Sequence, residues 1–74
     1  MSRKIKKTPY IKEIWKKTEG DERMIMFILY MDVSEYENEE AKDIMRLTGD
    51  IQWDQQSFHK AATMITNRMK KRPK

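Results

Sequence analysis

The stretch MIMFILYM, residues 24–31, decides the fold, because it is the longest uninterrupted apolar and aromatic run in the chain. A core has to form over this stretch, covered by the segments on either side. A run that is apolar on all sides fits either a buried helix or a buried strand. Its Met and Leu residues, and its lack of valine, favour a helix. We therefore expect an all-α fold, a single small domain of three to four short helices with residues 24–31 buried at its centre.

The alternative is a strand-helix-helix dimer. A strand followed by two helices resembles the order of ribbon-helix-helix repressors, which pair the strand across a dimer and read DNA with its outward side chains. Those outward positions should be polar, whereas here both alternating sets of the run are apolar or aromatic. A homodimer of some kind stays open, because a chain of 74 residues without cysteine has only a marginal core.

Local signals divide the rest of the chain into helices. Thr8-Pro9 predicts a helix start, and Gly20 predicts its end. Asp21 caps a second helix that contains the apolar run. Ser34 to Glu37 has the form of a capping box, which predicts a third helix from Ser34 to about Leu47. Asp54 caps a last helix that runs past Lys70 and stops at Pro73.

The domain limits follow from these signals. We expect residues 1–7 to be a flexible basic arm, residues 8–72 to be the helical domain and residues 73–74 to be a basic tail. The apolar residues at helical spacing give the expected core: Ile11, Ile14, Trp15, Ile25, Phe27, Ile28, Leu29, Ile44, Met45, Leu47, Trp53, Phe58, Ala62, Ile65 and Met69.

Charge is distributed unevenly along the sequence. Residues 1–18 carry seven basic residues and one acid (+6), residues 19–54 three and eleven (−8), and residues 55–74 six and none (+6), which sums to the net +4. Clustered Lys and Arg are the usual electrostatic footprint of a nucleic-acid-binding protein. The other interpretation is that the basic ends only keep the protein soluble.

The last helix is the best functional candidate. Its polar side would present amide, hydroxyl and basic groups, which can hydrogen-bond base edges or hold phosphates. Together with the preceding helix and turn, it resembles the order of a helix-turn-helix unit. The sequence thus predicts a non-enzymatic nucleic-acid-binding regulator, most readily of DNA, in transcription or replication control. The predicted contact residues are Arg3, Lys4, Lys6, Lys7, Gln55, Gln56, His59, Lys60, Thr63, Asn67, Lys70, Lys71 and Arg72, and Thr66 lies on the same polar side.

A second hypothesis belongs to another class of protein. Seven methionines and an acidic middle suit a small adaptor or inhibitor of the phage or mobile-element type, because Met surfaces adapt to partners. Its protein-binding residues would be the acids of the third helix: Glu35, Glu39, Glu40 and Asp43.

The sequence contains no pattern that indicates catalysis, metal binding or a membrane span. His59 is the only histidine, and neither it nor Ser57 can be matched with the remaining members of a catalytic set. We expect no enzyme activity, no metal and no cofactor. The run 24–31 is far shorter than the roughly 20 residues of a membrane span, so we expect a cytoplasmic protein without a membrane partner.

Overall fold

A computed structural model describes residues 5–70 of the protein. Over these residues the chain forms four helices and no strand: α1 (Pro9–Thr18), α2 (Glu22–Ser34), α3 (Glu39–Arg46) and α4 (Gln55–Met69). The all-α prediction is confirmed, and the strand-helix-helix alternative is not supported. Predicted contact residues Arg3, Lys4, Lys71 and Arg72 lie outside the described residues.

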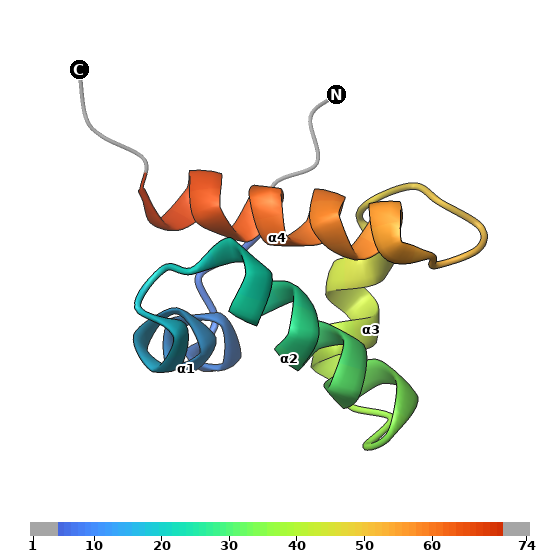
Figure 1. Cartoon of the computed structure of the whole chain (residues 1–74), viewed down its shortest axis with the longest axis horizontal. Helices are drawn as coiled ribbons and strands as arrows, with labels where there is room; N and C mark the ends of the chain where they lie inside the picture. The colour runs from blue at the N-terminus through green and yellow to red at the C-terminus, as the bar shows by residue number, and fades with distance from the viewer. Residues whose placement is uncertain (1–4, 71–74) are drawn as a thin grey trace.

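The helix α2 lies at the centre of the arrangement and packs against α1, α3 and α4 (Figure 1). Helix α4 crosses one side of the other three, with α1 near its C-terminal half and α3 near its N-terminal half. The most extensive packing joins α2 to α4, where Ala61 and Ala62 of α4 are fully buried. Their small side chains let the two helices approach each other closely.

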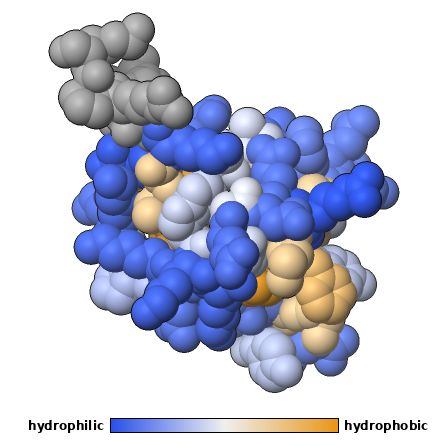
Figure 2. All heavy atoms as spheres, turned by 60° about the vertical axis from the view of Figure 1, so that its left-hand side comes forward, coloured by the Kyte–Doolittle hydropathy of each residue, from blue (hydrophilic) through white to orange (hydrophobic). Residues whose placement is uncertain are grey.

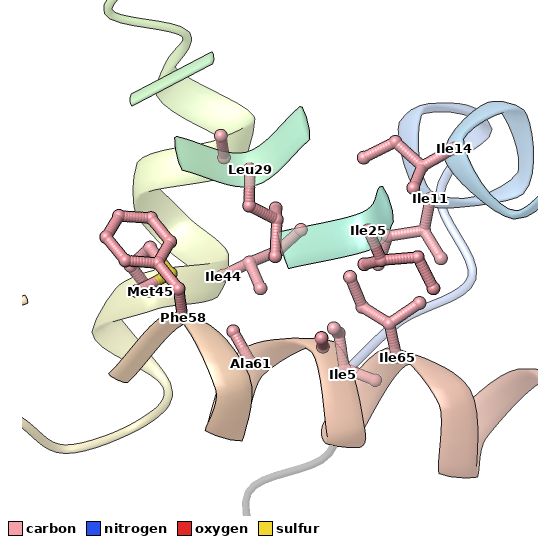
Figure 3. Packing of buried hydrophobic residues seen from close by; sticks show 12 residues of the cluster. Ile5, Ile11, Ile14, Ile25, Leu29, Ile44, Met45, Phe58, Ala61 and Ile65 are labelled. Atoms are coloured by element: carbon pink, nitrogen blue, oxygen red, sulfur yellow. The ribbon is translucent and has the colours of Figure 1, made fainter. Parts of the chain in front are cut away.

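Aliphatic side chains from all four helices form the core (Figure 3). Ile25 and Leu29 of α2 are fully buried; Ile25 lies toward Ile65 of α4, and Leu29 points toward Ile44 of α3. The buried apolar residues are Ile5, Ile11, Ile14, Ile25, Leu29, Ala41, Ile44, Met45, Phe58, Ala61, Ala62 and Ile65. Trp15, Ile28, Leu47, Trp53 and Met69 are partly buried against this cluster.

Three of the predicted helix starts are confirmed. The Thr8 hydroxyl accepts a hydrogen bond from the Ile11 amide at 3.3 Å, and Pro9 is the first residue of α1. The Asp21 carboxylate accepts from the Arg23 amide at 2.9 Å. The Asp54 carboxylate accepts from the Ser57 amide at 3.0 Å. Each cap satisfies an amide that the helix itself leaves without a partner.

The predicted capping box at Ser34 is wrong. Ser34 is the last residue of α2, and its hydroxyl donates to the Tyr30 carbonyl at 2.7 Å. Serine makes this bond to the carbonyl four residues earlier when it lies inside a helix. Glu37 takes a left-handed conformation (φ 47°), and Asn38 caps α3 by accepting from the Ala41 amide at 3.0 Å. Asn38 is as good a cap as serine. Because α3 begins after Asn38, Ser34 remains part of the last turn of α2.

Two predictions about burial also need correction. Phe27, expected in the core, is 64% exposed, because the other helices cover only the Ile25/Leu29 side of α2. Ile5, expected in a flexible arm, is only 5% exposed and belongs to the core.

Helix α4 ends at Met69 and does not run past Lys70.

Candidate nucleic-acid interface

The first half of α4 presents predicted contact residues beside acids. Gln55, Gln56 and His59 are exposed, as predicted. Glu22, at the start of α2, lies against this surface: its carboxylate accepts from the Thr63 hydroxyl at 3.3 Å and lies 3.8 Å from His59 Nε2. A carboxylate at this position repels phosphate, so this half of the helix is a poor place for a nucleic-acid backbone.

Lys60 has an acidic neighbour as well. Its Nζ donates to the Asp50 carboxylate at 3.1 Å, and the Ser57 hydroxyl donates to the same carboxylate at 2.7 Å. These two hydrogen bonds, the one from Ser57 first, lower the pKa of Asp50. Lys60 therefore stabilises the connection between α3 and α4 through Asp50. The hydroxyl of Ser57, which is buried, binds the same carboxylate and has a structural role.

The second half of α4 has a different setting. Arg68 Nε donates to the Ile5 carbonyl at 3.0 Å, and this bond joins residues 63 positions apart in the sequence. The Ile5 side chain is buried in the core, which holds this residue in place beside α4. Lys6 and Lys7, which follow Ile5, and Lys70, which follows α4, are exposed. The hydrogen bond from Arg68 to Ile5 therefore joins the described parts of the two basic segments, residues 5–18 and 55–70.

Two further lysines of α1 were not predicted from the sequence as contact residues. Lys12 and Lys16 are exposed on α1, which packs against α4. They lie four residues apart and thus on one face of the helix. Lys17, by contrast, pairs with Glu13 at 3.5 Å. Lys12 and Lys16 could have been predicted as contact residues, because their spacing places them together and away from the apolar stripe of α1.

Other predicted residues of α4 divide between surface and interior. Asn67 is exposed and remains available for contacts. The Thr66 hydroxyl is buried, so it cannot reach a base edge. The connection before α4 spans residues 47–54, longer than the roughly 3–4-residue turn of a helix-turn-helix unit.

The predicted protein-binding acids do not form one helical face. Glu35 lies at the end of α2, whereas Glu39, Glu40 and Asp43 belong to α3. Within α3 the acids have basic neighbours: Lys42 lies 3.8 Å from Glu39, and Arg46 pairs with Asp43. This internal pairing lowers the net charge that α3 can offer to a partner.

A groove between α2 and α4 was not predicted. Four aromatic side chains line it: Phe27, Tyr30, Trp53 and Phe58. Its volume is about 990 Å³, and Gln55, Gln56 and His59 lie at its polar edge. Tyr30 packs edge to face on Phe58, with ring centroids 5.6 Å apart. The sequence concealed this groove because its walls come from segments nearly thirty positions apart.

The described part of the chain contains no cluster of His, Asp and Glu that could hold a metal ion. Among the helices at residues 5–70, none has the length and apolar character that crossing a membrane requires. No family model, no curated protein and no solved structure matches this chain.

Proposed function

We propose that this protein is a small, non-enzymatic nucleic-acid-binding regulator of the cytoplasm, acting on DNA in transcription or replication control. The observation that carries the proposal is the junction of Ile5 with Arg68, which brings the two basic segments of the sequence together. Clustered Lys and Arg side chains bind phosphates, and such phosphate contacts supply most of the affinity of small basic proteins for nucleic acid.

The proposed interface, which we call the basic end, consists of exposed residues on the two segments that the hydrogen bond from Arg68 to Ile5 joins: Lys6, Lys7, Lys12, Lys16, Asn67 and Lys70. Lysines hold phosphates without reading sequence, and Asn67 can hydrogen-bond a base. The N-terminal half of α4 is left out of the interface because Glu22 and Asp50 lie against it.

Binding to duplex DNA, single-stranded DNA and RNA across a salt series tests this proposal. Between about 50 and 200 mM salt, a protein that neutralises several phosphates loses affinity steeply, with a log–log slope close to the number of contacts. We expect the double variant K12Q/K16Q to weaken binding to every sequence and to reduce the slope by about 1 for each lost contact.

The matched control is K42Q, which removes one lysine that lies between Glu37 and Glu39. It should leave both affinity and slope unchanged. No binding at 50 mM salt, or equal losses in K42Q and K12Q/K16Q, would contradict the proposal.

A further inference from the structure

The outward side of α2 is the most exposed apolar surface of the described chain that lies on a helix. Phe27 is 64% exposed, Tyr30 52% and Met24 49%. Figure 2 shows a group of apolar atoms at the lower right of a mostly hydrophilic surface, and a smaller group at the upper left. Contiguous apolar patches on a small protein mark sites of interaction, because each exposed aromatic ring costs free energy in water.

Phe27 lies between two grooves. On one side is the aromatic groove between α2 and α4 described above. On the other is a smaller groove of about 470 Å³ between α1 and the C-terminal half of α2, lined by Tyr10, Ile28, Met31 and Tyr36 among others. Phe27 lines both grooves, so it forms the ridge that separates them.

The walls of both grooves are held in place. The Tyr10 hydroxyl donates to the Asp32 carboxylate at 2.5 Å, which ties α1 to α2. Burial, together with this carboxylate, raises the pKa of Tyr10, so the hydroxyl stays a donor. In the larger groove, Trp53 Nε1 donates to the Asp50 carbonyl at 3.2 Å. The surface is therefore formed in advance of any contact.

Charge around the two grooves selects the partner. Glu22 and Asp54 line the larger groove, and Glu13 and Asp32 line the smaller one. Only Arg23 and Lys17 offer permanent positive charge there, and Lys17 is paired with Glu13. The two linings together therefore carry four acidic and two permanently basic side chains, a net charge of −2 (2 − 4). A basic partner is favoured, and the phosphates of a nucleic acid are repelled.

A second copy of the chain fits this surface less well. A two-fold symmetric dimer through α2 would place the same acidic surface on both sides of the contact. Like charges brought together in this way cost free energy. A helical segment is the natural occupant, because apolar side chains spaced three to four residues apart can enter the grooves on either side of a ridge.

We propose that the outward side of α2 is a docking surface for a basic amphipathic helix of a partner protein. Apolar residues of that helix enter the two grooves beside Phe27, and its Lys and Arg residues face the surrounding carboxylates. No residue of the basic end lines either groove, so a nucleic acid and a partner protein would not compete for the same side chains.

The test uses a fluorescein-labelled synthetic helix with Leu at positions i, i+3, i+4 and i+7 and Lys elsewhere. A matched peptide carries Glu in place of every Lys. Anisotropy titrations should show binding of the Lys peptide and at least about tenfold weaker binding of the Glu peptide. Phe27→Ala should weaken binding of the Lys peptide at least about tenfold, as for other central aromatic anchors.

The matched control is Ile51→Ala, since Ile51 is 97% exposed and lines neither groove. It should bind the Lys peptide as tightly as the unaltered protein, and circular dichroism should show that Phe27→Ala retains its helices. Equal binding by Phe27→Ala, or equal binding of the Lys and Glu peptides, would overturn the proposal. A dimer that Phe27→Ala dissociates would overturn it too, by showing that a second copy occupies the surface.

Discussion

The two sides of α2 differ although they come from one apolar stretch of sequence. The inward side, with Ile25 and Leu29, is fully buried against α4. The outward side, with Phe27 and Tyr30, is more than half exposed between two grooves. Hydrophobicity alone therefore does not fix burial: a 74-residue chain has too few segments to cover a helix on all sides. The uncovered side is available for a partner.

Truncating one residue on each side should give the largest contrast. We expect Leu29→Ala to lower the free energy of unfolding by about 3 kcal/mol, because it leaves a cavity in the core. Phe27→Ala should change it by about 0.5 kcal/mol or less, as at other exposed sites. Urea unfolding followed by circular dichroism measures both. Equal losses in the two variants would mean that Phe27 is buried in solution.

The point where α2 ends sets how far its outward side extends. Because Asn38 caps α3, we expect Asn38→Ala to lower the free energy of unfolding by about 1 kcal/mol. Ser34→Ala, which removes only a hydroxyl bonded within α2, should change it by less than about 0.5 kcal/mol. A larger loss of unfolding free energy in Ser34→Ala than in Asn38→Ala, measured by thermal or urea unfolding, would mean that Ser34 caps α3. In that case α2 and its outward side would end before Ser34.

The smallest expected effect concerns Asp50, whose backbone carbonyl accepts a hydrogen bond from Trp53 in the larger groove. The pKa of Asp50 is lowered from its ordinary value of 3.8, chiefly by the hydrogen bond from Ser57. A carboxyl with a lowered pKa contributes stability that is complete above 3.8 and is lost as the pH falls through the lower folded value. Ser57→Ala should move the Asp50 pKa back toward 3.8, measured by NMR titration of its carboxyl carbon. An unchanged pKa would show that Ser57 does not hold Asp50.

The extent of prediction from sequence can be judged from particular residues. Asp21 and Asp54 were predicted as caps and are caps, because an N-cap acts within three residues. Ser34 and Asn38 were both suitable caps in the same short segment, and local preference did not choose between them. The choice depended on the turn after α2, where the Asn38 amide donates to the Asp32 carbonyl at 2.8 Å.

The candidate sites show the same division. The sequence indicated which residues are basic and which face of α4 is polar. It did not indicate that Glu22 lies against His59 and Thr63, nor that Arg68 bonds the carbonyl of Ile5. Each of these contacts joins residues more than thirty positions apart, and no local pattern encodes such a pairing.

By itself, the sequence determined the all-helical class, most helix starts and the uneven distribution of charge, since these depend on residue type and on neighbours within one or two turns. Only the tertiary structure decided which side of residues 24–31 is buried, that Ile5 joins the core, and that the two basic segments meet. Those outcomes depend on which surfaces the few other helices can reach, and that is a property of the packed chain as a whole.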